Sequence, residues 1–135
     1  MTAKTYEISD DCRYARTDEW IRVDGAVARV GISDYAQAQL SDIVFVELPE
    51  VGTQVEAGEP FGVVESVKAV NDLFAPVSGE IIEVHTRLEE HPEWLNEDPY
   101  GRGWIISIAP EDLDAVETLM SPEEYREFIE ERSHS

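Results

Sequence analysis

The sequence predicts a mainly β domain: a small sandwich or flattened β-barrel of two related halves, with short helices and a C-terminal helical extension. Short β-branched segments recur along the chain, with turn residues between them. A strand, a short helix, Gly/Pro turns and an aromatic-led strand follow in the same order in "VARVGI…GEPFGVVES" and in "EIIEVH…GRGWIISIA". At 135 residues and 42% hydrophobic residues, the chain has the length of one domain with a modest core.

Five segments are expected as strands because they are β-branched, partly alternating and bounded by turn residues. They are residues 25–32, 42–49, 61–67, 79–85 and 101–108. "SDYAQAQL" (33–40) is expected as a short helix, with Ser33 or Asp34 as its N-cap. "PEVGTQVEAGEP" predicts turns around a brief strand. "TRLEEHPEWL" (86–95) predicts another short helix, with Pro92 inside its second half.

The C-terminal part of the chain is expected to be helical. "PEDLDAVETLM" (110–120) and "SPEEYREFIEER" (121–132) place apolar residues at helical spacing, so we expect one face of each to cover the β core. Ser121 and Glu124 match a capping box, with Pro122 at the first helical position. The expected organisation is a single domain over 1–135, a loose N-terminal segment over 1–12 and helices packed on the β core over 110–131.

The charge balance excludes several classes of partner. Ten Lys and Arg against 30 Asp and Glu give a net charge of −20, so neither nucleic acid nor an anionic membrane surface is an expected partner. No apolar run approaches the ~20 residues of a membrane span, and "MTAKTYEISDD" lacks a signal-peptide core. We therefore expect a cytoplasmic protein. Many acids with almost no lysine indicate a cytosol rich in salt, where self-repulsion is screened; the alternative is an ordinary acidic bacterial protein.

The side chains offer no stand-alone catalytic apparatus and no metal site. The three histidines, His85, His91 and His134, have no ligand-like spacing with one another or with a cysteine. Cys12 is the single cysteine, which excludes an internal disulfide and a cysteine-based metal site. The sequence has no G-x-S-x-G, no P-loop and no dinucleotide-binding fingerprint. We therefore expect a non-catalytic protein, with no catalytic residue and no metal.

One lysine is unusual in its setting. The chain has only two lysines, Lys4 and Lys68, against eight arginines. Lys68 lies between Val67 and Ala69 at a predicted hairpin tip, where Gly, Asn or Asp is the norm. A solvated surface charge is the ordinary role of such a lysine, but an arginine would serve that role equally well. Only a primary amine forms an amide on acylation, so Lys68 is a candidate for covalent attachment of a tethered group.

The stretch around Lys68 resembles the attachment motif of a known family. "ESVKAVND" is similar to the lipoyl-attachment motif of glycine cleavage system H proteins, and the likeness covers residues 14–130. It continues through "DEWIRVDGAVARVGISDYAQAQLSDIVFVELPEVG", "AGEPFGVVESVKAV", "APVSGEIIEV" and "LNEDPYGRGWIISI". Gly52 and Gly79, sixteen residues before and eleven after the lysine, fit the wider lipoyl/biotinyl pattern of two related half-motifs. The resemblance implies a lipoyl/biotinyl-like fold with lipoate on Lys68, in an attachment motif made of Glu65, Ser66, Val67 and Ala69.

The neighbours of the lysine weigh against two other kinds of carrier. A biotin carrier would show Met on either side of its lysine, whereas Val67 and Ala69 stand here. Lipoyl domains of 2-oxoacid dehydrogenases usually have Asp before the lysine and lack the C-terminal helical extension. The chain departs from the resembled family at Asp18, where His is frequent, and at His85, where Asn is frequent.

The resemblance implies a carrier that moves the aminomethyl group of glycine on a lipoyl-lysine arm. Its partners would be a pyridoxal-phosphate glycine decarboxylase, a tetrahydrofolate-dependent aminomethyltransferase, dihydrolipoyl dehydrogenase and a lipoyl-attaching enzyme. Glu19 and Asp72 are candidates for docking the loaded arm, because carboxylates would hold its ammonium. The alternatives are a relay that supplies lipoyl or octanoyl groups, a biotinyl-type carrier, and a binding or scaffold protein without modification. We expect a monomer.

Overall fold

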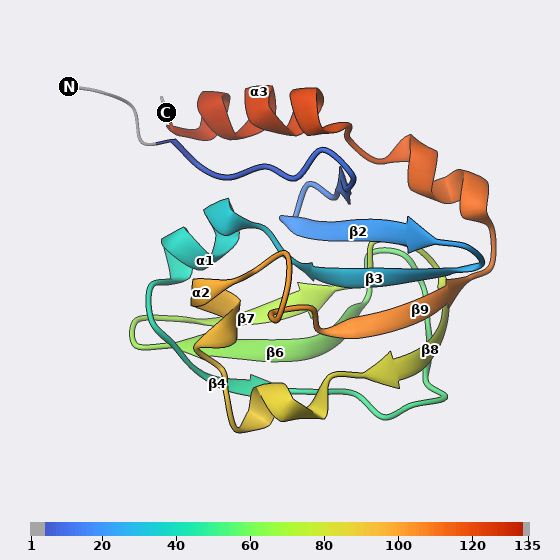
Figure 1. Cartoon of the computed structure of the whole chain (residues 1–135), viewed down its shortest axis with the longest axis horizontal. Helices are drawn as coiled ribbons and strands as arrows, with labels where there is room; N and C mark the ends of the chain where they lie inside the picture. Colours follow the sequence, from blue (N-terminus) through green and yellow to red (C-terminus); the bar gives the residue numbers. More distant parts are fainter. Residues whose placement is uncertain (1–4, 134–135) are drawn as a thin grey trace.

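Two antiparallel sheets form the body of the molecule (Figure 1). The computed structural model describes residues 5–133. Within them, one sheet has the strand order β1-β2-β3-β9-β8-β5 and the other the order β4-β6-β7. The strands are β1 (Arg13–Tyr14), β2 (Glu19–Asp24), β3 (Val27–Ile32), β4 (Ile43–Glu47), β5 (Gln54–Val55), β6 (Pro60–Ser66), β7 (Val70–Phe74), β8 (Gly79–Val84) and β9 (Ile106–Pro110).

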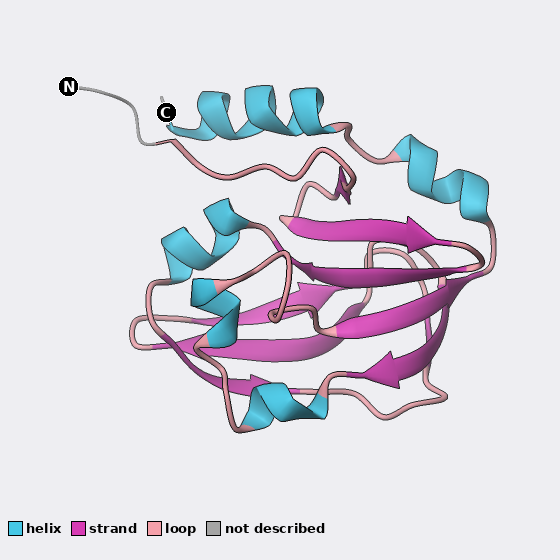
Figure 2. Ribbon diagram, viewed as in Figure 1, coloured by secondary structure: helices cyan, strands magenta, loops and turns pink. Residues whose placement is uncertain are grey.

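The helices are short and lie around the sheets (Figure 2). They are α1 (Asp34–Leu40), α2 (Trp94–Glu97), α3 (Pro122–Ser133) and two 3-10 helices, η1 (Thr86–Glu89) and η2 (Leu113–Thr118). No helix in the described part of the chain has the length and apolar character needed to cross a membrane. The sheets are not closed into a barrel. The predicted fold class is therefore confirmed, in its sandwich form.

The apolar faces of both sheets meet in one core. In β3, Ala28 and Val30 are fully buried while Arg29 between them is exposed, which is the period-two alternation of a strand with one wet face. Val46 of β4 and Val64 of β6 complete the core from the smaller sheet. Each large aliphatic side chain buried in this way contributes about 1.5–3 kcal/mol, so the core fixes the register of the strands.

A second, aromatic cluster lies under α3, at the β1–β2 edge of the larger sheet. The buried rings of Tyr14 and Tyr125 stack with their centroids 4.3 Å apart. Near the end of α3, Arg132 donates to the two carboxylate oxygens of Asp18 at 2.7 and 3.1 Å, and the Tyr125 hydroxyl donates to Asp18 at 2.9 Å. Asp18 has a φ of 79°, which Asp tolerates better than most residues. These contacts fasten the helix to the turn before β2.

The N-terminal segment runs beside α3 (Figure 1). The backbone N–H of Glu7 donates to the Asp34 carboxylate at 2.8 Å, and the Tyr100 hydroxyl donates to the Glu7 carbonyl at 2.9 Å. From residue 5 onward the segment is therefore held by hydrogen bonds. The first four residues of the expected loose segment, Lys4 among them, lie outside the described residues.

Most of the predicted elements are confirmed. β3, β4, β6 and β8 correspond to segments expected as strands, and β5 is the brief strand among the turns. Ser33 is the N-cap of α1, where its hydroxyl accepts from the Ala36 N–H at 3.1 Å. The capping box of α3 is also present: Glu124 accepts from the Ser121 N–H at 2.9 Å, and the Ser121 hydroxyl accepts from the Glu124 N–H at 3.2 Å.

Two predictions of local structure are wrong. Residues 86–95 do not form one helix, because the chain makes η1, turns, and enters α2 only at Trp94. Pro92 lies in that interruption, and its missing N–H and its ring disfavour a helix that passes through it. β9 begins at Ile106, later than expected, because residues 101–103 form turns. The predicted pattern of β-branched residues continues only beyond those turns.

The C-terminal apolar faces are used unequally. Val116, Tyr125 and Ile129 are buried as expected, but Leu113 is 43% exposed. Residues 113–118 form a 3-10 helix. Its three-residue repeat places Leu113 and Val116 on one face, yet only Val116 is buried. The two halves suggested by the order of elements differ in strand pairing. The two strands of the second half, β8 and β9, pair with each other, whereas those of the first half, β3 and β6, lie in different sheets.

Candidate functional site

Lys68 lies at the tip of the hairpin that joins β6 to β7. The two strands pair up to Glu65 and Val70. Ser66 closes the turn: its N–H donates to the Ala69 carbonyl at 2.8 Å, and its hydroxyl accepts from the N–H groups of Lys68 and Ala69 at 3.3 and 3.1 Å. The Lys68 side chain is exposed and has no salt-bridge partner among residues 5–133. The amine is thus presented to solvent on a closely hydrogen-bonded base.

The turn needs no glycine. None of its residues has a positive φ, so Val67 and Ala69 meet no backbone conflict. The Val67 N–H donates to the Asp42 carbonyl at 3.0 Å, which ties the tip to the segment before β4. Ala69 packs against the core. The hairpin can therefore lack the glycine usual at such a tip, because a serine hydroxyl and a neighbouring segment hold its turn.

Exposed apolar side chains surround the base of the hairpin. A bulge near the start of β4 leaves both Val44 and Phe45 half-exposed, and Val67 and Val70 are more exposed still. Phe45 stands opposite Glu65, which stands opposite Val70, so the three form one row across the smaller sheet. The lysine therefore rises beside a surface on which a carboxylate separates two apolar side chains.

Glu19, at the start of β2, is only 2% exposed. One carboxylate oxygen accepts from the Thr17 hydroxyl and the other from the Phe74 N–H at 3.0 Å. Burial raises the pKa of Glu19 to about 7, against the opposing effect of these two hydrogen bonds, and the charge of Asp18 adds a little to the rise. Phe74 is the last residue of β7. Glu19 therefore sits at the end of the strand that carries Asp72.

Asp72 differs from Glu19 in its environment. It is exposed on β7, opposite Val63 and four residues beyond Lys68. The structure thus brings both docking candidates to the edge strand of the smaller sheet, one in solvent and the other enclosed. Sequence reasoning did not find the Thr17 hydroxyl as the partner of Glu19; the only signal in the sequence was the spacing of two residues between them.

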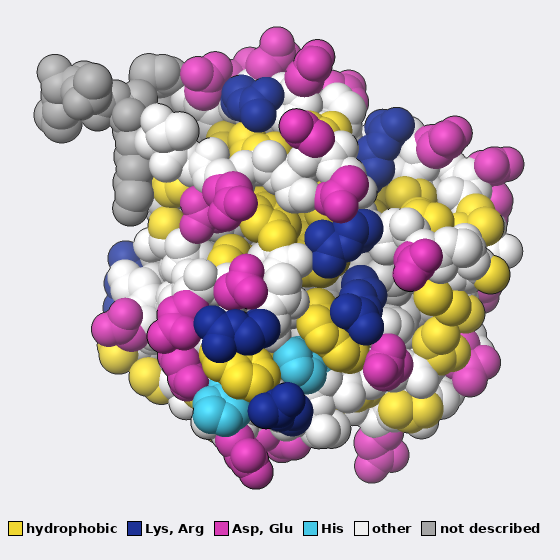
Figure 3. All heavy atoms as spheres, viewed as in Figure 1, with side chains coloured by type: hydrophobic (Ala, Val, Ile, Leu, Met, Phe, Trp, Pro, Cys, Tyr) yellow, Lys and Arg dark blue, Asp and Glu magenta, His cyan; other side chains and the backbone are white. Residues whose placement is uncertain are grey.

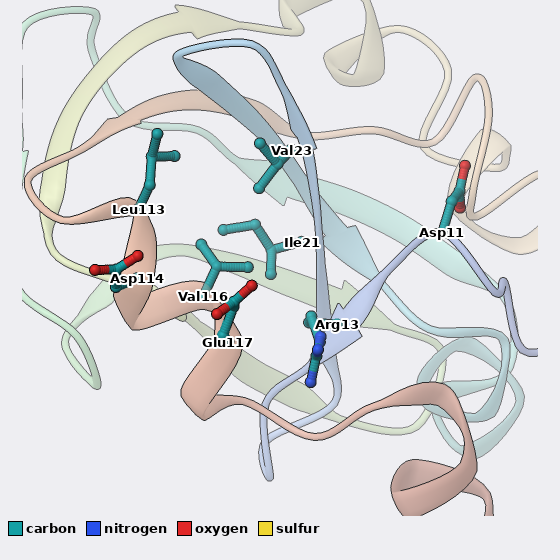
Figure 4. Close-up of a pocket in the computed structure, with 8 residues that line it drawn as sticks. All are labelled: Asp11, Arg13, Ile21, Val23, Leu113, Asp114, Val116 and Glu117. Atoms are coloured by element: carbon teal, nitrogen blue, oxygen red, sulfur yellow. The ribbon is translucent and has the colours of Figure 1, made fainter.

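A hollow lies in another part of the surface (Figure 4). This cavity of about 360 Å³ is lined by Asp11, Arg13, Ile21, Val23, Leu113, Asp114, Val116 and Glu117. No sequence-predicted site residue lines it. Among the described residues no group of His, Cys, Asp or Glu could hold a metal ion. Cys12 is buried, and burial raises its pKa to about 12, so the thiol stays protonated. Neither a metal group nor Cys12 therefore adds to the predicted site, whose candidate group is the exposed amine of Lys68.

The fold and the site together define a class of protein. An exposed primary amine projects from a hydrogen-bonded hairpin of a β-sandwich, beside an open surface and away from the cavity. This geometry presents a tethered group to other proteins at high effective concentration. The class is that of the swinging-arm carrier domains.

Comparison with known proteins identifies the family within that class. Residues 12–132 match the model of the glycine cleavage H-protein. The glycine cleavage system H protein of Rubrobacter xylanophilus is 58% identical over 125 residues, which are 93% of this chain and 97% of that protein. The probable glycine cleavage system H protein of Haloarcula marismortui is 51% identical over 126 residues, 93% and 99% of the two chains. The chain belongs to the glycine cleavage H-protein family, as its attachment motif predicted.

The fold agrees with this family. The crystal structure of a glycine cleavage system H protein from Mycobacterium marinum matches with a TM-score of 0.81 and 45% sequence identity, covering 89% of this chain and 97% of that one.

Proposed function

We propose that Lys68 is the lysine that carries lipoate and that Glu65, Ser66, Val67 and Ala69 form its attachment motif. As a member of its family, the chain is a non-catalytic lipoyl carrier of the glycine cleavage system. The observation that supports the assignment is the exposed Lys68 amine at the hairpin tip, the one lysine among residues 5–133. Lipoate bound there as an amide supplies a reducible disulfide that accepts the aminomethyl group of glycine.

The protein's own contribution is to hold and present the arm. Ser66 fixes the turn through four hydrogen bonds at its backbone and hydroxyl, so the arm would begin at the Lys68 side chain. Val67 and Val70 keep apolar surface exposed on either side of the lysine. We propose that the attaching enzyme grips this rigid, apolar hairpin while the amine enters its active site.

We further propose that the loaded arm lies along the edge of β7. Asp72 would meet its ammonium in solvent, and Glu19 would meet it at the end of the strand. A cation beside Glu19 would favour the ionised carboxylate and offset the cost of burying that charge. As a test, Asp72→Ala and Glu19→Ala should each shorten the hydrolysis half-life of the aminomethylated protein. An unchanged half-life removes that residue from the docking role.

The attachment is tested by intact mass after expression in a host that can lipoylate. The wild-type protein should carry one lipoyl group and the Lys68→Arg protein none. Lipoylated protein should then support glycine–bicarbonate exchange with glycine decarboxylase. Lipoylation without exchange would favour the lipoyl or octanoyl relay. A biotin adduct, or no adduct at all, would favour the biotinyl-type carrier or the unmodified scaffold.

As a glycine cleavage H-protein, the chain interacts with the other glycine cleavage enzymes. We propose as its individual partners the pyridoxal-phosphate decarboxylase, the tetrahydrofolate-dependent aminomethyltransferase, dihydrolipoyl dehydrogenase and a lipoyl-attaching enzyme. The net charge of −20 suits partners with basic docking surfaces. We propose a cytoplasmic monomer, in which one hairpin serves all of these partners in turn.

A further inference from the structure

A surface rich in arginine and aromatic rings lies around α2. We call it the basic aromatic surface, and its members are Arg29, His85, Arg87, His91, Trp94, Arg102 and Trp104. In Figure 3, arginine and histidine side chains gather over hydrophobic ones around the position of α2. The chain as a whole carries a net charge of −20. Glu93, Glu97 and Asp98 also lie here and pair with His91 and Arg102. The cations that remain are Arg29 and Arg87, which would attract an acidic partner.

The rings of this surface form one connected group. His85 stacks on Trp104 with the centroids 4.4 Å apart and lies 5.7 Å from the ring of Trp94. His91 stacks on Trp94 at 4.4 Å. The Nδ1–H of His85 donates to the Trp104 carbonyl at 2.7 Å, which fixes the orientation of its ring. The aromatic groups are therefore held in place before any partner arrives.

Two arginines lie over these rings with their N–H groups open. The guanidinium of Arg29 is 4.3 Å from the Trp104 ring, and that of Arg87 is 5.1 Å from the Trp94 ring. Within the described residues, neither has a carboxylate within 4.0 Å, and neither side chain donates a hydrogen bond to protein. Arg102, by contrast, pairs with two carboxylates of its own. A guanidinium backed by a ring presents its donors edge-on, in the geometry that binds carboxylates.

This surface adjoins the lysine hairpin. Asn96 of α2 accepts a hydrogen bond from the Ile43 N–H at 2.9 Å. The carbonyl of Asp42, the residue before Ile43, accepts from the Val67 N–H at 3.0 Å. Two successive hydrogen bonds thus join α2 to the residue that precedes Lys68. An enzyme that receives the arm comes within reach of the basic aromatic surface.

We propose that the basic aromatic surface docks a carboxylate-rich surface of one enzyme that acts on the Lys68 arm. The inference rests on the carrier function proposed above. Arg29 and Arg87 would each pair with an Asp or Glu of that enzyme, and the tryptophans would supply buried aromatic area, which dominates the energetics of many interfaces. The acidic remainder of the chain repels an acidic partner, so such an enzyme is confined to this one face. An acidic enzyme would therefore dock on the carrier in one orientation, which basic partners do not share.

The test uses charge reversal with a matched control. The lipoylated Arg29→Glu/Arg87→Glu protein is compared with Arg16→Glu/Arg126→Glu, which changes the net charge equally at two exposed arginines beside or on α3. Each serves as the varied substrate for the purified decarboxylase, aminomethyltransferase, dihydrolipoyl dehydrogenase and attaching enzyme at low KCl. For one enzyme we expect the first pair to raise KM about tenfold or more with kcat unchanged. The control pair should raise it less than threefold, and molar KCl should reduce the difference.

Each other outcome has a defined meaning. Equal KM values for the two pairs with every enzyme refute the proposal. So does a wild-type dimer in sedimentation that the Arg29→Glu/Arg87→Glu pair converts to a monomer, because the surface would then join two copies of this chain. If circular dichroism shows that this pair is misfolded, Arg29→Gln/Arg87→Gln replaces it, with an expected rise of about threefold. A wild-type protein without lipoate overturns the proposed function itself, and mass spectrometry reveals that case before any kinetic assay.

Discussion

The buried carboxyl of Glu19 should make the stability of this protein depend on pH. Its pKa is raised from 4.5 to about 7, chiefly by burial. Between these values the folded protein holds a proton that the unfolded chain does not. Stability falls with rising pH wherever the folded state binds more protons. The contribution of Glu19 is therefore fully present below pH 4.5 and is lost as the pH rises through 7.

The expected size of the effect follows from the two pKa values. A shift from 4.5 to about 7 corresponds to ~3 kcal/mol at ~1.4 kcal/mol per pH unit. Glutamine has the shape of the protonated acid: its oxygen can accept from the Phe74 N–H, and its amide can donate to the Thr17 hydroxyl. Glu19→Gln should therefore match the wild type within ~1 kcal/mol at pH 5 and be more stable by up to ~3 kcal/mol at pH 8.

Urea unfolding followed by tryptophan fluorescence, at pH 5 and pH 8 in the same KCl concentration, measures this difference. Trp20, next in sequence to Glu19, is fully buried and becomes exposed on unfolding, so it contributes to the signal together with Trp94 and Trp104. Glu80→Gln, on the exposed face of β8, controls for the removal of one negative charge. If Glu19→Gln and the wild type differ by the same amount at both pH values, the carboxyl does not bind a proton on folding and the reasoning is refuted.

The same measurement on loaded protein would connect Glu19 to the arm. An ammonium docked against Glu19 favours its ionised form. The aminomethylated wild type should therefore recover stability at pH 8 relative to the unloaded protein, whereas aminomethylated Glu19→Gln should show no such gain. A gain of equal size in both would place the ammonium elsewhere, with Asp72 as the remaining candidate.

Three further outcomes are expected. Ser66→Ala removes the hydroxyl that accepts from two N–H groups of the turn. It should therefore lower the free energy of unfolding by ~1 kcal/mol and slow lipoylation several-fold in a timed assay. An unchanged lipoylation rate would show that the attaching enzyme does not need a fixed turn. Gly79→Ala would press a Cβ against the Ala109 carbonyl oxygen and should cost ~3 kcal/mol in urea unfolding. Gly25→Ala, at a φ of 68° with open space around it, should cost only ~1 kcal/mol. The free energy of unfolding should rise by on the order of 1 kcal/mol from low to molar KCl, because screening relieves the repulsion within a chain of net charge −20. A free energy of unfolding that does not change with KCl would contradict a high-salt cytosol.

Local signals in the sequence predicted much of the fold. The capping box of Ser121 and Glu124, the N-cap at Ser33 and the β-branched strands depend on residues a few positions apart, and all are present. The split of the expected helix at Pro92 also had a local cause, but proline alone does not say whether a helix bends or stops. Lys68 was selected as the candidate attachment residue because a lysine is unusual at a hairpin tip, which again is a local property.

Contacts between distant segments could not be predicted in this way. The environment of Glu19, the proposed docking carboxylate, includes a hydrogen bond from the Phe74 N–H, 55 residues away. The basic aromatic surface likewise combines Arg29 of β3 with rings from the segment between β8 and β9. Charge composition weighed against nucleic acid and an anionic membrane as partners, but it carries no information on where the eight arginines lie after folding.

The distribution of stabilising contacts explains how the protein can leave the lysine that we propose as its attachment site so open. A group that must enter several foreign active sites cannot be packed into its own core, so the hairpin gains little from burial at its tip. Its rigidity comes instead from hydrogen bonds at Ser66 and from the Val67 N–H to the segment before β4. The larger apolar contributions come from the core between the sheets and from the aromatic cluster under α3. Because neither includes the Lys68 side chain, docking and release of the arm can proceed without loosening the fold.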